Sequence, residues 1–352
     1  MPTICTFNAN NLFVRYHFGR TFPGDLTGKS AIENPATGYL PIYDPALFEL
    51  FNPTQRKLAA RAITNDGNDF PDTICFQEIE SLIALRKFNE ELLEEKYPYA
   101  LLIDSRDFRQ IDVGILSRLK ILDVRTHLED LDPDPPTPIP KGPPKKPRLF
   151  SRDCLEVELA LNSSGSTRLT LFINHLKSKF SDTPVERQQA DALRLRQAKA
   201  IPKIVRARFP GAKFNQELFA VIGDLNDEPL SEPILPLTRD SGLINVLDRL
   251  PAPEDRWTYW FRGQNSVSQI DYMLLSPALD AATAGALPRV ERRGISFATI
   301  LADGKPGPKQ SHLHRSDPDP NPSLVNFRFP RFAEVTRQDF ASDHCPVFLD
   351  IP

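Results

Sequence analysis

The stretch LFAVIGDLN, residues 218–226, is a short apolar run that ends in Asp224 and Asn226. Its length and its content of Val, Ile and Phe are typical of a buried β-strand. Five other strand-like runs carry the same kind of polar residue at one end: TICTFNAN with Asn8 and Asn10, DTICFQE with Glu78, LTLFINH with His175, QIDYMLLS with Asp271 and FASDHCPV with Asp343 and His344. One such polar end is ordinary at a protein surface. Six, all drawn from Asp, Glu, Asn and His, indicate a shared site at a sheet edge.

The rest of the pattern predicts the fold class. Helical spacing of apolar residues predicts helices at 53–63, 82–95 and 184–209. We expect Pro202 to kink or split the third helix, because proline lacks the amide donor that a helix interior needs. Two long helices among many direct strand-to-strand connections favour an α+β sandwich over a doubly wound sheet.

Composition excludes several protein classes. The formal net charge is −3, so the overall charge does not favour nucleic acid, and any basic surface must be local. The four cysteines form no CxxC pair and are expected to be small buried hydrophobes, not zinc ligands. No apolar run approaches the ~20 residues of a membrane span, and the N-terminus resembles no signal peptide. We therefore expect a cytoplasmic protein.

Proline is concentrated in two stretches, residues 131–148 and 303–323. Such segments favour extended surface loops, because proline fits neither a helix interior nor a central strand. They could be linkers between domains. The strand-like pattern continues on both sides, however, so we expect insertions within one domain that spans residues 1–352.

The polar residues at the strand ends also suit one chemistry. Carboxylate and amide oxygens favour a hard divalent cation such as Mg²⁺ or Mn²⁺. Histidines near carboxylates favour proton transfer and charge stabilisation at a phosphorus centre. The sequence contains no GxxxxGK[ST], GxGxxG, HExxH or GxSxG motif.

Six segments in order, FNAN, FQE, NHLKSK, GDLND, QIDYMLLS and SDHCPV, resemble the motif set of the endonuclease/exonuclease/phosphatase superfamily, the DNase I-like proteins. Each motif is short and weak alone, but six in order are specific. The resemblance covers almost the whole chain. It implies a four-layer α/β sandwich, in which two packed mixed β-sheets are flanked by helices.

The resemblance implies roles for a metal site. Glu78 matches the main metal ligand of the family. Asn8, Asn10 and Asp343 match positions that ligate or support the metal. The implied cofactor is Mg²⁺ or Mn²⁺.

It also implies roles in catalysis. His344 matches the histidine that activates the attacking water, and Asp271 matches the carboxylate that orients it. Asp224 and Asn226 match the pair that positions the water and the phosphoryl oxygens. His175 matches the histidine of DNase I-like and sphingomyelinase-like members, where apurinic endonucleases carry asparagine.

Shorter matches suggest further residues. The segment FSRD resembles a DNase I stretch whose arginine contacts the scissile phosphate, so Arg152 is a phosphate candidate; the alternative is an exposed arginine at a strand start. Lys177 and Lys179 follow His175 and are also phosphate candidates. Asp104 ends the run YALLID and is a possible partner for His175.

Nucleic acid is the expected substrate, DNA or RNA. The segment QIDYMLLS lacks the arginine that inositol polyphosphate 5-phosphatases carry after the aspartate, and NHLKSK with the basic region 187–208 is similar to bacterial nucleases. That basic region could follow a phosphate backbone, although a solvated helix face explains it as well. The aromatic run WTYWF, residues 257–261, is expected in the core, with a base-stacking rim as the alternative.

Two other functions stay open. One is a phospholipid or sphingomyelin phosphodiesterase, or a phosphomonoesterase, of the same superfamily. The other is an inactive phosphate-binding or protein-binding module, although such a module needs no intact proton-transfer pair. No obligate protein partner is indicated by the sequence.

Overall fold

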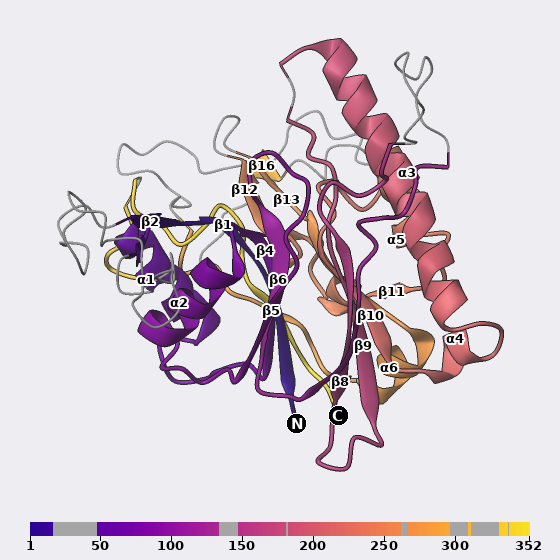
Figure 1. Cartoon of the computed structure of the whole chain (residues 1–352), viewed down its shortest axis with the longest axis horizontal. Coiled ribbons are helices and arrows are strands. Elements are labelled where there is room, and N and C mark those ends of the chain that lie inside the picture. The colour runs from indigo at the N-terminus through magenta and orange to yellow at the C-terminus, as the bar shows by residue number, and fades with distance from the viewer. Residues whose placement is uncertain are drawn as a thin grey trace, which may run out of the picture.

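The computed structural model of the chain describes residues 1–16, 48–133, 147–180, 182–261, 266–295, 309–310, 331–336 and 338–352. Two six-stranded sheets pack against each other, and helices cover their outer faces (Figure 1). Each sheet contains parallel and antiparallel neighbours. The α+β sandwich of two mixed sheets between helical layers is therefore confirmed.

The first sheet has the strand order β15-β17-β1-β4-β6-β5. Its strands are β1 (Thr3–Leu12), β4 (Thr73–Ile79), β5 (Tyr99–Leu102), β6 (Asp112–Ser117), β15 (Arg289–Val290) and β17 (Val347–Asp350). The strands β1 and β17, from opposite ends of the chain, pair antiparallel. The helices α1 (Pro53–Ile63) and α2 (Leu82–Leu92) cover the outer face (Figure 1). Phe7, Phe76 and Phe88 join sheet and helices in one buried cluster.

The second sheet has the strand order β11-β14-β10-β9-β8-β7. Its strands are β7 (Ile121–Arg125), β8 (Cys154–Ala160), β9 (Arg168–His175), β10 (Phe219–Asp224), β11 (Ile244–Asn245) and β14 (Asp271–Leu275). The long helix α3 (Pro184–Arg208) lies along its outer face (Figure 1). Ile201 and Val205 of this helix belong to one buried cluster with Phe172 and Phe219 of the sheet.

The inner faces of the two sheets share a core of aliphatic side chains. Ile4 and Ile115 of the first sheet belong to one buried cluster with Leu171 and Ile222 of the second. Because the central strands are buried on both faces, they read as continuous apolar runs in the sequence. All four cysteines are buried and free, as expected for small hydrophobes.

Shorter elements complete the fold. They are β2 (Val14–Tyr16), β3 (Phe48–Leu50), β12 (Tyr259–Phe261), β13 (Ser266–Ser268), β16 (Lys309–Gln310), α4 (Lys213–Gln216), α5 (Leu235–Thr238), α6 (Pro277–Ala282), and the 3₁₀ turns Glu232–Ile234, Val246–Arg249 and Pro253–Asp255. The strand β12 carries part of the aromatic run. Trp257 and Trp260 are buried with Cys345, which confirms the core expectation for the two tryptophans.

The three predicted helices are present with small differences. The helix α1 has the predicted bounds, and α2 ends three residues earlier than predicted. The helix α3 continues through Pro202 without a break, so a split at this residue is wrong. Ala198 and Ile201 on one side of the proline and Val205 on the other are fully buried. This packing outweighs the missing hydrogen bond, because tertiary burial supplies most of a helix's stability.

The proline-rich stretches lie mostly outside the described residues. At the first, Leu131 and Arg148 form an antiparallel bridge, and Asp132 accepts a bond from Arg196 of α3 at 2.8 Å. The flanking strands β7 and β8 are neighbours in one sheet. Of the second, only β16 is described, paired with β13. Within the described residues, no helix combines the length and apolarity that a membrane crossing needs.

Candidate active site

Strand register brings three of the predicted residues into one row. On the second sheet, Asp224 of β10 pairs with His175 of β9 on one side and with Asp271 of β14 on the other. Gly223 precedes Asp224 with a backbone φ of 128°, and a Cβ there would lie 2.1 Å from the carbonyl oxygen of Asn174. Only glycine fits this close approach, so Gly223 lets β10 deliver Asp224 to the row.

Glu78 reaches the site through an irregularity in the first sheet. Gln77 pairs with Val113 and Ile79 with Asp112, so Glu78 is an extra residue on its strand. Its backbone φ is 63°, an uncommon value for a glutamate that costs about 1–3 kcal/mol. A β-bulge of this kind redirects a side chain out of the ladder. The bulge at Glu78 therefore directs its carboxylate toward His175 of the second sheet.

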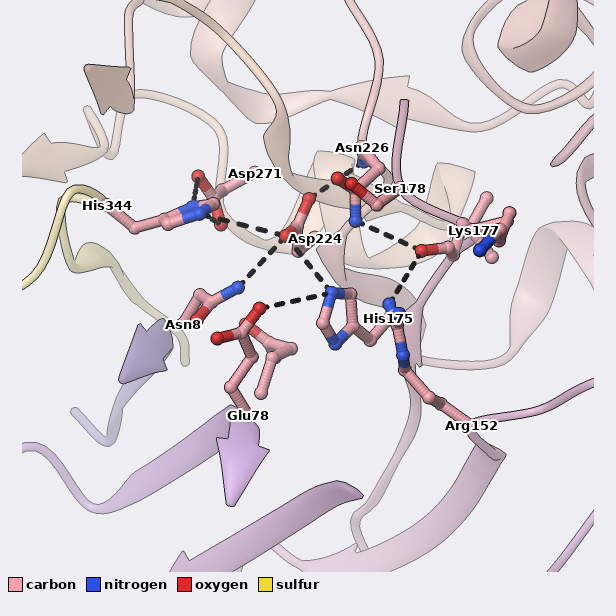
Figure 2. Close-up of polar contacts among 12 residues, drawn as sticks. Asn8, Glu78, Arg152, His175, Lys177, Ser178, Asp224, Asn226, Asp271 and His344 are labelled. Atoms are coloured by element: carbon pink, nitrogen blue, oxygen red, sulfur yellow. Dashed lines mark hydrogen bonds and ion pairs between the residues drawn. The ribbon is translucent and has the colours of Figure 1, made fainter. Parts of the chain in front are cut away.

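The two sheets meet at Asp224 (Figure 2). Asn8 of β1 donates from Nδ2 to Asp224 Oδ2 at 3.0 Å. His175 Nε2 lies 3.4 Å from the same oxygen and 3.8 Å from Glu78 Oε1. The predicted residues from both sheets are thus brought together around one carboxylate.

His344 completes the group from the segment before β17. Its Nδ1 lies 2.9 Å from Asp271 Oδ2 and 3.1 Å from Oδ1, and its Nε2 lies 3.9 Å from Asp224 Oδ2 (Figure 2). The imidazole is therefore held by one carboxylate and faces another, which is the arrangement of an oriented general base.

Thr258 holds this pair in place and was not predicted. Its fully buried hydroxyl donates to Asp271 Oδ2 at 2.7 Å and accepts from the Asp271 amide at 3.0 Å. Its carbonyl also accepts from the amide of Cys345, next to His344, at 2.6 Å. No sequence pattern marks this threonine, because its contacts depend on how β12 lies against β14 and the C-terminal segment.

The two histidines have opposite pKa shifts. Burial alone would lower the pKa of His344, but Asp271, with Asp224 and Asp343 nearby, raises it to about 10. Burial lowers the pKa of His175 well below its ordinary value, and Arg152, His344 and Arg109 lower it further. His175 is therefore neutral, and its buried Nδ1 has no hydrogen-bond partner among the described residues.

The acidic groups carry more negative charge than the site balances. Burial, together with repulsion from Asp271, raises the pKa of Asp224 to about 7 against the effect of His344. Burial, with Glu78 and Asp271 nearby, also raises the pKa of Asp343. Four carboxylates in one group, with amide oxygen nearby, form a donor set that fits a hard divalent cation.

Two subsets of these residues could hold that cation. Ligand atoms of Asp224, Asp271 and His344 lie within 4.8 Å of one another. In this subset, however, Asp271 already binds His344 Nδ1 and the Thr258 hydroxyl. Glu78 Oε1 accepts no hydrogen bond in the described part of the chain, and the charge of Glu78 is close enough to Asp343 to raise the pKa of that carboxyl group. The Glu78 side of the site is therefore the better position for a cation.

Asn10 and Asp104 have different surroundings. The Asn10 side chain accepts from Asn11, and its backbone amide donates to Asn8 Oδ1 at 3.0 Å, so Asn10 holds the side chain of Asn8. Asp104 is exposed and does not contact His175. The predicted Asp104–His175 pair is therefore wrong, because the loop after β5 turns this carboxylate to solvent.

The phosphate candidates lie beside His175. Arg152 is 1% exposed, so an exposed arginine at a strand start is wrong. It donates to Asp107 Oδ2 at 2.9 Å and to the Leu176 carbonyl at 3.0 Å, and Asn226 Nδ2 donates to the same carbonyl at 3.0 Å (Figure 2). Lys179 pairs with Asp227 Oδ1 at 2.5 Å.

The arginines of the basic helix have mainly structural contacts. Arg194 is fully buried and bonds Asp227 Oδ2 at 3.0 Å, and Arg196 bonds Asp132. Arg206 donates to the Ser241 carbonyl at 2.8 Å. These three residues therefore neither follow a phosphate backbone nor form a purely solvated face, because internal acceptors already hold their guanidinium groups.

Tyr259 of the aromatic run lies beside the site. Its ring centroid lies 4.7 Å from that of His344, and the two residues form an antiparallel bridge. Its neighbour Phe261 is 38% exposed, with the two rings stacked at 6.4 Å. The core expectation is wrong for these two residues, because the short strand β12 turns them toward the site and the solvent.

Comparison of the fold with solved structures gives similar proteins of low identity. SmcL has a TM-score of 0.53 and 14% identity, with 100% of this chain and 99% of that chain covered. The human nocturnin catalytic domain with bound sulfate has a TM-score of 0.50 and 14% identity, covering 100% and 94%. Sphingomyelinase C from Streptomyces griseocarneus has a TM-score of 0.50 and 15% identity, covering 100% and 99%. At this identity the similarity shows the fold alone.

Sequence comparison identifies the family. No curated protein matches the chain. The model of the Endonuclease/Exonuclease/phosphatase family matches residues 5–344, which includes every residue of the group around Asp224. The protein therefore belongs to the endonuclease/exonuclease/phosphatase family.

Proposed function

We propose that the protein is a divalent-metal-dependent phosphodiesterase that hydrolyses nucleic acid by in-line attack of an activated water. The observation that carries this proposal is the connected chain from Thr258 through Asp271 to His344, which faces Asp224 across 3.9 Å. A module that only binds phosphate has no need of such a chain, which argues against the inactive alternative.

In the proposed reaction, His344 is the general base. Its Nδ1–H donates to Asp271, which leaves the Nε2 lone pair to accept a proton from water. Asp224 faces the same space and, with Asn226, positions that water. Asn226 also adopts a positive φ of 55°, and its backbone N–H donates to Asp224 Oδ1 at 2.8 Å, so the two residues form one hydrogen-bonded turn.

His175 serves a different purpose in this proposal. Its lowered pKa makes it a weak base, so it does not compete for the water's proton, and its Nε2 lies 3.4 Å from Asp224 Oδ2. It is placed to stabilise negative charge that develops on a phosphoryl oxygen.

Glu78, with Asp343 and Asn8, would hold Mg²⁺ or Mn²⁺. When bound, the cation offsets the clustered carboxylates and stabilises charge on the phosphoryl oxygen. Because Asp224 and Asp343 contribute to the raised pKa of His344, a cation that offsets their charge would lower this pKa and favour the neutral imidazole. The bulge at Glu78 supports this role, because it costs stability and places one carboxylate.

A second candidate function is hydrolysis of a phospholipid or sphingomyelin. The fold similarity to Sphingomyelinase C and the presence of His175 favour it. The cationic side chains of Arg152 and Lys177, near His175, favour a polyanionic substrate instead.

We further propose a cytoplasmic location and one domain over residues 1–352. The four free cysteines support a reduced compartment, and the pairing of β1 with β17 supports one domain.

Cleavage assays test the proposed function. Supercoiled plasmid and single-stranded RNA are incubated with Mg²⁺, with Mn²⁺ or with EDTA, beside release of choline phosphate from sphingomyelin. We expect metal-dependent cleavage of a nucleic acid that is lost in His344→Ala. Release of choline phosphate without nucleic acid cleavage would support the lipid alternative, and metal-independent inertness of a folded protein would support the binding module.

A further inference from the structure

Three cationic side chains lie beside His175: Arg109 on the loop after β5, Arg152 just before β8 and Lys177 on the loop after β9. Arg109 is exposed, Lys177 is half-buried and Arg152 is buried. One carboxylate, Asp107, accepts from both arginines, at 2.9 Å from Arg152 and at 3.2 Å and 3.3 Å from Arg109. We call Arg109, Arg152, Lys177 and Asp107 the cationic cluster.

The backbone of Lys177 is held on both sides by α3. Its amide donates to Gln197 Oε1 at 2.9 Å, and its carbonyl accepts from Arg194 at 2.8 Å. Arg152 meanwhile joins the two loops, since it bonds Asp107 in one and the Leu176 carbonyl in the other. Arg152 and the backbone of Lys177 are thus held in fixed positions, and the exposed Arg109 is held by its bonds to Asp107.

The cluster has more positive charge than its own acidic residue can balance. It contains three cations and one carboxylate, and Lys177 has no ion pair with any described carboxylate. Burial lowers the pKa of Lys177, and Arg152 and Arg109 lower it further. A half-buried ammonium crowded by like charges is stabilised by an incoming anion.

The position of the cluster relative to the catalytic group suggests what that anion is. The charges of Arg152 and Arg109 act on His175, and Leu176, which Arg152 and Asn226 share, precedes Lys177 directly. Figure 2 shows Arg152 and Lys177 on the side of His175 away from His344. The cluster therefore flanks the reaction centre opposite the proposed base.

We propose that Arg109 and Lys177, above the buried Arg152, form a subsite for a second phosphate group of the substrate, next to the phosphate that is cleaved. This inference rests on the proposed phosphodiesterase function and adds a substrate preference to it. Chains of phosphodiesters present such a neighbouring phosphate. A lipid with a single phosphate and a cationic choline does not, and its cation is repelled by the cluster.

The test compares small substrates that differ by one phosphate. Thymidylyl-thymidine has only the cleavable phosphate, whereas its 5′-phosphorylated and 3′-phosphorylated forms have one more on either side. We expect kcat/KM to be about tenfold higher for at least one phosphorylated form, since a charge-assisted contact contributes on this scale. Bis(4-nitrophenyl) phosphate reports the hydrolytic chemistry without any second phosphate.

Variants assign the preference to the cluster. Arg109→Gln and Lys177→Gln are each expected to remove most of the tenfold preference, because each lowers kcat/KM for the phosphorylated dinucleotide by a larger factor than for bis(4-nitrophenyl) phosphate. Arg106→Gln is the matched control: it lies in the same loop, its side chain is 54% exposed, and it pairs with Glu129 outside the cluster. This variant should keep the preference.

The outcomes separate the two proposals. Hydrolysis of bis(4-nitrophenyl) phosphate with equal rates on all three dinucleotides would overturn the subsite and leave the chemistry standing. If no substrate is hydrolysed, the proposed function fails, and binding of a fluorescent oligonucleotide in EDTA still tests the subsite. There, each cluster variant should weaken binding and reduce the salt dependence by about one phosphate contact. Unchanged binding and salt dependence would overturn it.

Discussion

His344 and His175 lie on opposite sides of Asp224, and their surroundings differ in almost every respect. His344 is anchored through Nδ1 to Asp271, which Thr258 holds in turn, and carboxylates raise its pKa to about 10. His175 has a buried Nδ1 without a partner among the described residues, and nearby arginines add to the effect of burial on its lowered pKa.

This difference shows how one residue type acquires two functions in one site. A partner at Nδ1 fixes the orientation of His344 and, with the other carboxylates, raises its pKa. A bound cation would bring that pKa back toward the operating pH, where a general base works. Burial, with no described carboxylate at Nδ1 and with cations nearby, keeps His175 neutral, so that it is a weak base with one N–H to donate. Charge is therefore distributed unevenly across the site: carboxylates surround the proposed base, and cations lie where we place the substrate phosphates.

Loss of the base should have the largest effect. We expect His344→Gln to lower kcat by about 10³-fold or more with little change in KM, because the proton of the attacking water has no acceptor. Plasmid nicking rates measure this. His127→Gln is a control in a histidine that pairs with Asp130 far from this group, and it should retain activity. Retention of activity in the His344 variant would contradict the proposed role.

Loss of the neutral histidine should cost less. We expect His175→Asn to lower kcat by about 10²-fold, as for one donor to a developing charge, without moving the pH profile. Asp104→Asn is the matched control for a partner of His175. Because Asp104 is exposed, this variant should change the rate less than about twofold. A large effect of Asp104→Asn would restore the pair that the structure rejects.

A smaller effect is expected at Thr258, the residue that orients Asp271. Thr258→Val keeps the shape and removes the hydroxyl, and we expect kcat to fall about tenfold at unchanged KM. Thr258→Ser keeps the hydroxyl and should recover most of the activity. A purely structural role predicts the same loss of thermal stability in both variants and no difference in kcat between them.

The pH dependence of metal-free stability should sharpen the comparison with the smallest signal. The folded pKa of His344 is above the unfolded value of about 6.5, so its stabilising contribution is present below that pH and is lost as pH rises toward about 10. His175 has the opposite shift, so the folded state loses stability as pH falls below about 6.5.

Thermal unfolding in EDTA from pH 5 to 10 measures both contributions. His344→Gln should lower the melting temperature most at the acidic end. His175→Asn should reduce the wild-type loss of stability at that same end. Parallel curves for the two variants would show that the charge states of the two histidines do not differ as the structure indicates.

Much of the fold and site could be predicted because strand geometry is local. Short length and apolar composition located β10 and β14, and the polar residues at their ends met because neighbouring strands in register place them side by side. His175, Asp224 and Asp271 follow from this rule. The helix α1 was also predicted with its bounds, since its pattern and its leading proline are local signals.

Other features depended on contacts between distant segments. The position of Asp104 is decided by the turn of a loop, and the role of Thr258 by the 2.7 Å hydrogen bond from this residue, just before β12, to Asp271 of β14. Arg194 and Arg196 belong to a basic region for which the sequence left a phosphate contact and a solvated helix face open, and they are instead held by Asp227 and Asp132. The sequence gives the charge of a basic residue but not its partner, because the partner comes from a distant segment that packs against it.

The sequence by itself determined which groups could take part: carboxylates, amides and imidazoles at strand ends, of a type that suits a divalent cation and a phosphodiester. The tertiary structure decided their charge states and their division of work. The pKa of a group depends on burial and on charges a few ångströms away, and both arise only when the two sheets pack and bring Asn8 and Glu78 to Asp224.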